Sequence, residues 1–522
     1  MRQILEIQLT PKQSTDAEAV RKVAARLLKV SPGRIWHIKY LKRSVDARSK
    51  KIWVRLKAEF FIGEKLSFEE TNLRKEYPFV GTRPAIIIVG AGPAGLFSAL
   101  RLIERGLRPI IIERGKDVKA RKFDIAQLSR EHIVNPDSNY CFGEGGAGTY
   151  SDGKLYTRST KRGNVQDVLQ DLVNHGANPE ILFDAHPHIG TDKLPAIIGA
   201  IRKTILDSGG EFYFNHRVED FIIESGKLKG VITRNGTTFE GLSVILATGH
   251  SARDIYRLLH RKSVLLEAKP FALGVRIEHP QQLIDYLIYK QEIREQYLPA
   301  AAYSVVEQVD GRGVFSFCMC PGGIIVPSAT AEGQVVVNGM SNSQRNSEFA
   351  NSGMVVTVNL EDYQPYAEQG ALAGLAYQEA VEQLAFSISG NSQKAPAQRM
   401  ADFKEGKISQ SLKASSYHPG IVSAPLHELL PTEIGARMQG AFPMFDKKLR
   451  GYLTNEAMLL MVESRTSSPV RIPRDPESFE HVTIANLYPC GEGAGYSGGI
   501  VSSALDGINC AEKIALRFIK NV

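Results

Sequence analysis

The chain has 522 residues, of which 43% are hydrophobic and 23% charged, as expected of a globular protein with two to four domains. Its five cysteines form no pair of Cys-x-x-Cys motifs, which argues against a disulfide framework, a zinc site or an iron–sulfur cluster. The first residues lack the apolar run of a secretory signal, and no stretch is apolar over the thickness of a bilayer. We therefore expect a cytoplasmic protein with no metal site and no membrane segment.

Positive charge is concentrated at the N-terminal end. The formal net charge is +8, and residues 1–84 hold 19 Lys/Arg against 9 Asp/Glu. A strand-like Gln3–Leu9, a helical period over Asp16–Leu28 and a hairpin over residues 35–61 predict a small basic α/β domain at residues 1–83. The charge fits a solvated surface or a domain contact, and a face that binds nucleic acid is the alternative.

The next segment predicts a βαβ unit. Ala85–Val89 is an uninterrupted apolar run, typical of a strand buried on both faces of a parallel sheet. A glycine turn and a helix to about Arg105 follow, and Pro109–Glu113 is the next strand. We expect this unit to open the first part of an FAD-binding core at residues 84–270.

The glycine turn has the sequence Gly90-Ala91-Gly92-Pro93-Ala94-Gly95. Gly90 permits the tight bend, Gly92 lets the backbone approach a pyrophosphate, and Gly95 lets the helix pack on the strand. Pro93 fits the first helical turn, where its missing N–H costs nothing. Glu113 at the end of the second strand can accept hydrogen bonds from ribose hydroxyls. The pattern predicts a dinucleotide-binding site with its pyrophosphate at the helix N-terminus.

The Gly-x-Gly-x-x-Gly pattern occurs twice more, beginning at Gly143 and at Gly493. The first of these lies in a glycine-rich loop without a preceding strand, and we expect it to run along the ribityl chain and isoalloxazine of a flavin. The second follows a strand that ends near Glu492, and too few residues remain for a second dinucleotide fold. Glu492 can bind ribityl hydroxyls, and a helix that starts near Gly498–Ile500 can direct its dipole at the flavin's pyrimidine edge. This segment turns a dinucleotide site into an FAD site.

The middle of the chain predicts the rest of the core and a second domain. A helix over Asp192–Ser208, strands and a hairpin over residues 211–239, and a buried strand at Val244–Ala247 continue the core. Residues 271–442 lack nucleotide signals and are expected to form a substrate or cap domain, after which residues 443–522 complete the core. The expected fold class is α/β: a Rossmann-type FAD-binding domain with an inserted mixed α+β cap domain and a small N-terminal α/β domain.

Several of these segments together resemble a known family, the FAD-dependent dehydrogenases that are loosely called NAD(FAD)-utilising dehydrogenases. The resemblance implies a flavoprotein core of the glutathione-reductase or hydroxybenzoate-hydroxylase kind and no particular substrate. Many flavoproteins have Asp where this chain has Glu492, which is one methylene longer. The segments that carry the resemblance are Gly90–Leu96, Glu113-Arg114, Gly143–Leu155, Leu246–Asp254, Phe317–Gly323, Asn338–Ser341, Glu463–Arg471 and Tyr488–Gly507.

The residues expected to bind FAD lie in the three glycine segments and at the ends of the strands beside them. They are Gly90, Gly92, Pro93, Ala94, Gly95, Glu113, Arg114, Gly145, Gly146, Ser151, Lys154, Val218, Thr248, Gly249, Gly491, Glu492, Gly498, Gly499 and Ile500. No second complete βαβ fingerprint is present for a nicotinamide cofactor. NAD(P)H would therefore bind transiently at the flavin, or a separate electron-donor protein would reduce it.

Cys320 is the candidate catalytic residue. It alternates with Cys318 along a strand, so both thiols can face one pocket as redox or acid/base groups; two small buried side chains are the alternative. Lys154 and His250 follow cofactor loops and are further candidates for polarising a flavin carbonyl or donating a proton. The sequence thus predicts an FAD-dependent oxidoreductase that acts on a small molecule under the cap. The alternatives are a nucleic-acid-directed flavoprotein, such as an RNA-modifying enzyme, and a flavin-binding regulator.

Overall fold

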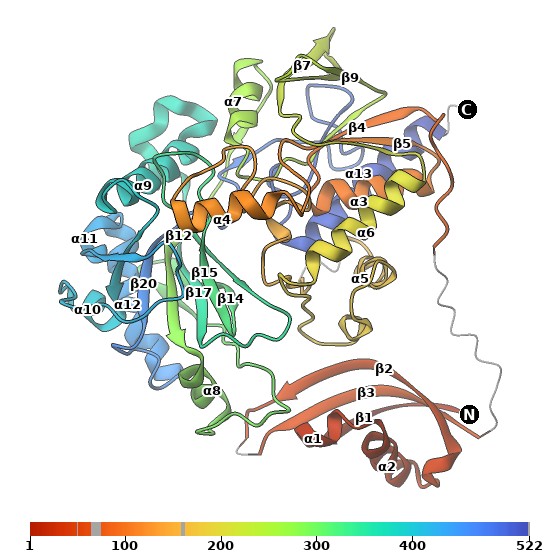
Figure 1. Ribbon diagram of the computed structural model, residues 1–522, viewed down its shortest axis with the longest axis vertical. Helices are drawn as coiled ribbons and strands as arrows, with labels where there is room; N and C mark the ends of the chain where they lie inside the picture. The colour runs from red at the N-terminus through yellow and green to blue at the C-terminus, as the bar shows by residue number, and fades with distance from the viewer. Residues whose placement is uncertain (50, 64–74, 158–161, 520–522) are drawn as a thin grey trace.

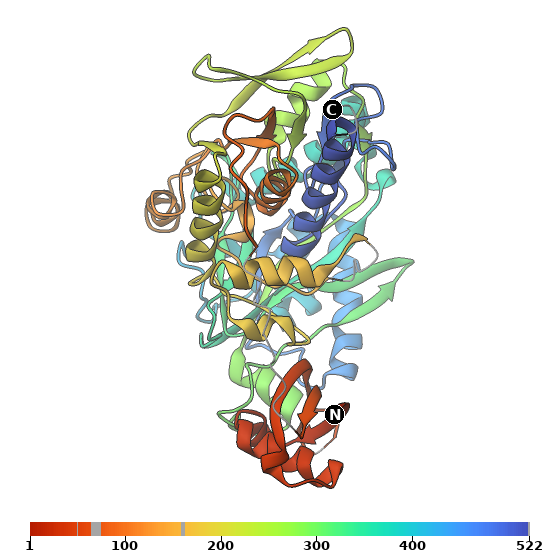
Figure 2. The same ribbon diagram turned by 90° about the vertical axis from the view of Figure 1, so that its right-hand side faces the viewer.

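The N-terminal domain lies at one end of the molecule (Figures 1 and 2) in a computed structural model that describes residues 1–49, 51–63, 75–157 and 162–519. Its antiparallel sheet has the order β1-β3-β2, and α2 begins at its N-cap Asp16 and covers one face through Val20, Ala24 and Ala25. The elements are β1 (Arg2–Leu9), α1 (Pro11–Ser14), α2 (Ala17–Leu28), η1 (Pro32–Arg34), β2 (Ile35–Asp46) and β3 (Trp53–Ile62).

Part of the basic charge of this domain serves a domain contact. Arg43 on β2 pairs with Glu180 at 2.9 Å and with Asp184 at 2.7 Å, both in the body of the molecule. The backbone of Arg43 also bonds to Phe183 and Ala185. The predicted strand, helix and hairpin of residues 1–62 are confirmed, because each falls on one of these elements.

The core contains a five-stranded parallel sheet with the order β22-β10-β4-β5-β6. Helices α3, α6 and α13 lie side by side on one face (Figure 1), and the small sheet β7-β8-β9 packs against the other. The elements are β4 (Ala85–Val89), α3 (Pro93–Glu104), β5 (Arg108–Ile112), α4 (Arg121–Glu131), η2 (Gly146–Gly148), α5 (Val165–Asn174), η4 (Pro179–Leu182), α6 (Leu194–Asp207), β6 (Glu211–Tyr213), β7 (Val218–Glu224), β8 (Lys227–Thr233), β9 (Thr238–Glu240), β10 (Val244–Leu246), α7 (Arg253–Arg261), β22 (Leu487–Pro489) and α13 (Ile500–Ile519).

The cap is built on a seven-stranded mixed sheet with the order β13-β14-β17-β12-β20-β18-β19. Alternate residues of β12, such as Val275 and Ile277, pack under the helices of the cap, so Arg276 faces the opposite side, toward the core. The elements are β11 (Glu267–Ala268), β12 (Phe271–Pro280), α8 (Gln281–Tyr289), β13 (Val306–Val309), β14 (Arg312–Cys320), β15 (Gly323–Pro327), β16 (Val337–Ser341), β17 (Phe349–Val358), η5 (Leu360–Leu372), α9 (Ala373–Ile388), β18 (Ala395–Arg399), α10 (Met400–Glu405), β19 (Ile421–Ser423), α11 (Leu426–Leu429), α12 (Thr432–Lys448), β20 (Met458–Glu463) and β21 (Val470–Arg471).

The boundary expected between cap and core at residue 442 is wrong. It falls inside α12, and β20 pairs with β12 and β18 in the cap sheet, so the cap continues at least to Glu463. The pairing of β20 with β12, about 180 residues earlier in the chain, is non-local and leaves no signal in the sequence near residue 442. Within the described part of the chain, every helix is too short or too polar to cross a lipid bilayer.

Candidate FAD site and the cavity under the cap

A cavity of about 330 Å³ lies between the core and the cap. One wall consists of the loops that follow β4, β5, β10 and β22 at the carboxyl edge of the parallel sheet, and the other consists of residues from β14, β16 and the end of β20. Ligands of open α/β sheets bind at this edge, and the volume is in the range of small-molecule sites.

The turn after β4 has the geometry that its glycines predict. Gly90 has φ +107°, and a Cβ there would lie 2.5 Å from the carbonyl oxygen of Ala247. A Cβ on Gly95 would collide with the carbonyl of Gly90, so α3 packs directly on the turn. Gly92 is the N-cap of α3 and Pro93 lies in its first turn, which leaves the helix N-terminus open to the cavity.

Glu113 does more than the sequence indicated. Its buried carboxylate accepts backbone N–H bonds from Ala91 at 2.9 Å, Gly115 at 2.9 Å and Gly143 at 3.0 Å. A carboxylate offers about four lone-pair directions, so little capacity remains for a ribose hydroxyl. Glu113 therefore also ties the first glycine turn to the second glycine loop.

Arg121 holds the second glycine loop from behind, and sequence reasoning missed it. Its fully buried guanidinium donates to the carbonyls of Asn139 at 2.7 Å, Glu144 at 2.8 Å and Gly146 at 2.9 Å. Burial lowers the pKa of Arg121 from its ordinary value. The sequence gives no signal for this role of Arg121, because the role depends on where the loop of residues 139–146 lies in space.

Glu492 and His250 face each other in the core wall of the cavity. His250 Nε2 lies 3.7 Å from a Glu492 oxygen, and the N–H of Gly499 at the start of α13 donates to the other oxygen. Burial, with Arg465 and Arg253 nearby, lowers the pKa of His250 to about 3, so the ring is neutral. Burial raises the pKa of Glu492, and the Gly499 N–H opposes that shift.

The cavity gathers nearly all the residues that the sequence assigned to FAD. Gly95 and Gly145 are not in its wall: Gly95 is a packing residue, and Gly145 donates its N–H to the carbonyl of Ala91 at 2.8 Å. The predicted residues in the wall are Gly90, Gly92, Pro93, Ala94, Glu113, Arg114, Gly146, Ser151, Lys154, Val218, Thr248, Gly249, Gly491, Glu492, Gly498, Gly499 and Ile500.

Cys320 lies in the cap wall of the same cavity, between two cations. Its sulfur is 3.8 Å from Lys154 Nζ and 3.5 Å from Arg276 Nη2. Cys318 lines the wall beside it at φ +46°, in an irregularity of the β14–β17 pairing. The Cys318 thiol is accessible from the cavity but enclosed by protein, and this enclosure raises its pKa to about 11.

Glu463 is the acidic group of the cap wall, and the sequence did not single it out as a site residue. It lies at the end of β20 and pairs with the fully buried Arg276 at 3.1 Å. Burial raises the pKa of Glu463, and Arg276 opposes the shift. A signal was present, because Glu463 ends an apolar strand, and Glu113 was predicted as a site residue from the same position.

A buried ionic network joins the core to the cap behind the cavity. Glu382 on α9 pairs with Arg253 of α7 at 2.8 Å and with Arg465 after β20 at 3.0 Å. Burial acts to raise the pKa of Glu382, but the two guanidiniums lower it to about 2. Two arginines thus share the carboxylate of Glu382. One of them, Arg465, also lines the cavity.

Comparison with known proteins gives the family. A protein of Clostridium beijerinckii without an assigned function is 39% identical to this chain over 96% of it and 97% of the relative. The chain belongs to the same family. Family models match an FAD-binding domain at residues 85–127, the C-terminal domain of FAD-dependent proteins at 270–466 and a domain of unknown function at 1–61. The match to an FAD-binding domain and to the C-terminal domain of FAD-dependent proteins confirms the FAD that the sequence predicted.

More distant likenesses cover parts of the chain. A thiamine thiazole synthase of Aeropyrum pernix is 27% identical over 35% of this chain and 60% of its own length. A solved structure of the flavin-dependent brominase Bmp2 is 13% identical, with 84% of this chain and 79% of that chain covered at a TM-score of 0.36. The two FAD-related family models support an FAD-dependent flavoprotein, while the narrower dehydrogenase family stays a prediction.

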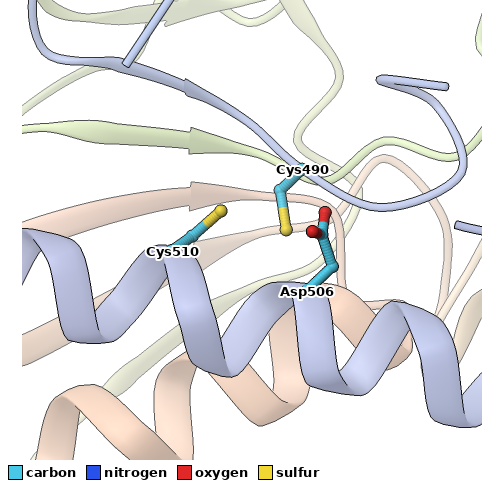
Figure 3. A group of neighbouring side chains, drawn as sticks. All are labelled: Cys490, Asp506 and Cys510. Atoms are coloured by element: carbon cyan, nitrogen blue, oxygen red, sulfur yellow. The ribbon is translucent and has the colours of Figure 1, made fainter. Parts of the chain in front are cut away.

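One group of described side chains in this family member has the spacing of metal ligands. Cys490 after β22 points toward Asp506 and Cys510 on α13 (Figure 3), and all three are buried. Both oxygens of Asp506 are already taken by Arg474, at 2.6 and 3.0 Å, and Gly491 N–H donates to one of them at 2.8 Å. A metal ion would have to displace the guanidinium, so the group instead fixes the end of β22 to α13.

Proposed function

We propose that the protein is an FAD-dependent oxidoreductase whose small-molecule substrate binds in the cavity between the flavin and the cap. The observation that carries this proposal is the cavity itself, which is continuous from the Gly90–Gly95 turn to Cys320. When bound, FAD supplies two-electron transfer, a chemistry that belongs to the cofactor rather than to the protein. The resemblance to FAD-dependent dehydrogenases implies a dehydrogenase activity, which is part of this proposal.

The core residues would hold FAD by its charged and hydroxylated groups. The open N-terminus of α3 at Gly92 and Pro93 would bind the pyrophosphate, as helix N-termini bind anions. Glu492 would bind ribityl hydroxyls, and α13 from Ile500 would present its N-terminal dipole to the flavin. Other core residues of the cavity wall, such as Arg114 and Thr248, would enclose the cofactor and exclude water.

The cap residues would act on the substrate. Cys320 is the proposed redox or acid/base thiol, because its sulfur lines the cavity and lies 3.8 Å from Lys154 Nζ and 3.5 Å from Arg276 Nη2. Glu463 offers a second group that can exchange a proton, since burial favours its protonated form. Electrons would come from NAD(P)H that binds transiently at the flavin or from a separate donor protein.

The proposal is tested by closing the cap side of the cavity. Holoprotein is reduced anaerobically and mixed with a panel of quinones, disulfides, nitro compounds and enoates while flavin absorbance is followed. Asn338→Trp fills the cap wall and should abolish reoxidation by the active compound with FAD still bound, whereas the exposed Gln344→Trp should leave it unchanged. Unchanged reoxidation in Asn338→Trp would place the reaction outside this cavity.

The role of Cys320 has its own test. Cys320→Ser should slow turnover and shift its pH profile, while Cys510→Ala, a buried cysteine outside the cavity wall, should change neither. Equal turnover and an identical pH profile in Cys320→Ser would leave Cys320 as a packing residue.

A further inference from the structure

Lys154 is the cation of the cavity whose charge is least balanced. Its nearest carboxylate is Asp152, with a separation of 3.7 Å. Asp152 is already bound by Arg345, whose Nη2 and Nε lie 2.5 and 3.1 Å from its oxygens, and it also accepts the hydroxyl of Ser341. Against the effect of burial, both Lys154 and Arg345 lower the pKa of Asp152, but Asp152 makes its hydrogen bonds with Arg345. Among the described residues, the ammonium group of Lys154 therefore has an ion pair at 3.7 Å and no hydrogen-bonded carboxylate.

The other charged groups of the described cavity wall have closer partners. Arg114 pairs with Asp137 at 2.7 Å, Glu463 with Arg276 at 3.1 Å, and Arg465 with Glu382 at 3.0 Å. Arg217 pairs with Asp254 at 3.2 Å, and Glu113 is bound by backbone N–H groups. A ligand anion in the cavity would give Lys154 the hydrogen-bonded counter-charge that these other groups already have.

A second hydrogen-bond donor lines the cap wall. Asn338 on β16 accepts the N–H of Gly339 through Oδ1 at 2.7 Å, which fixes the orientation of its amide. Its NH2 group has no hydrogen-bond partner among the described residues, and the side chain borders the cavity. An amide NH2 and an ammonium group that line the same cavity are donors that suit a carboxylate.

We propose that Lys154 and Asn338 bind a carboxylate group of the substrate. The inference rests on the proposed function, because it makes the cap wall the substrate side of the cavity. The sequence predicted that Lys154 binds FAD, whereas this inference assigns Lys154 to the substrate. The neighbours of Lys154 favour this assignment, since Asp152 is bound to Ser341 and Arg345 of the cap and Cys320 belongs to the cap sheet.

Two matched pairs of probes test the charge requirement. Benzoate and benzamide, and acetate and acetamide, have nearly the same shape and differ in charge. Binding to the oxidised, FAD-loaded protein is measured by calorimetry, which needs neither turnover nor a flavin signal. At least one anion should bind, with its amide at least about tenfold weaker, because a hydrogen bond to a charged group contributes about 1.5–3 kcal/mol.

The variants separate the two assignments of Lys154. Lys154→Met should weaken the anion about 10- to 100-fold and leave the amide and the FAD dissociation constant unchanged. Lys154→Arg should retain most of the affinity, Asn338→Ala should lose part of it, and Lys203→Met on the exposed face of α6 should change nothing.

Three results would overturn the inference: no binding of either anion, equal binding of anion and amide, or a Lys154→Met variant that weakens FAD but not the anion. Failure of the proposed function would appear differently, as unchanged reoxidation in Asn338→Trp. The failure of the inference can therefore be told apart from the failure of the proposed function.

Discussion

Glu382→Gln tests whether the ionic network behind the cavity holds the cap on the core. The substitution keeps the size of the side chain and removes its charge. It leaves Arg253 and Arg465, which are 7% and 6% exposed, without a full counter-charge and turns an NH2 group toward one of them. Removing one partner of a buried pair costs about 3–5 kcal/mol, a large share of the roughly 5–15 kcal/mol that stabilises a domain.

Urea unfolding followed by the fluorescence of released FAD measures this cost. The midpoint should fall by roughly 1 M or more in Glu382→Gln. The control is Glu456→Gln, whose partner Lys413 is 40% exposed and whose loss should cost less than about 1 kcal/mol. Equal midpoints for the two variants would refute the reasoning.

The network also makes a prediction about acid. The folded-state pKa of Glu382 is about 2, below its ordinary value, so its stabilisation is complete above the ordinary range and is lost as pH falls toward 2. In Glu382→Gln this part of the acid dependence should be missing. If Glu382→Gln lost stability at low pH in the same way as the wild-type protein, Glu382 would not be the source of this pH dependence.

Three further predictions concern the cofactor side. Gly90→Ala should weaken FAD binding in a fluorescence titration. Gly106→Ala, with φ +73° and open space around it, should keep FAD and lose about 1–2 kcal/mol of stability. Equal FAD affinities would disprove the role of the turn. Arg121→Met should speed proteolysis within residues 139–146, and no change relative to the exposed Lys122→Met would count against it. His250, with a pKa near 3, should make stability rise with pH between 3 and about 6.5, by at most about 1.4 kcal/mol per pH unit, and an unchanged slope in His250→Gln would exclude it as a source.

The core could be predicted from the sequence because its signals are local. The apolar run Ala85–Val89, the glycine turn and the strand to Glu113 are adjacent, and each restricts the backbone by itself. The same holds for the hairpin at Asn235-Gly236 and for the helix that starts at Ile500. The glycine turn after β4 and the start of α13 both line the cavity at the carboxyl edge of the sheet, where FAD binding stays a prediction.

The cap could not be predicted because its sheet joins distant segments. β12 pairs with β17 and β20, and β20 begins at Met458, far from Phe271 in sequence. No local pattern shows that Arg276 would meet Glu463 or Cys320 in space. Arg276, Glu463 and Cys320 therefore come together through the strand order of the cap sheet and not through a sequence motif.

An experimental structure of the FAD-bound protein tests the central claim most directly. The account predicts the adenosine-diphosphate end of FAD at the Gly90–Gly95 turn and the isoalloxazine in the cavity, with one face toward Cys320 and Asn338. An isoalloxazine that points away from the cap wall, or that lies outside the cavity, would contradict it.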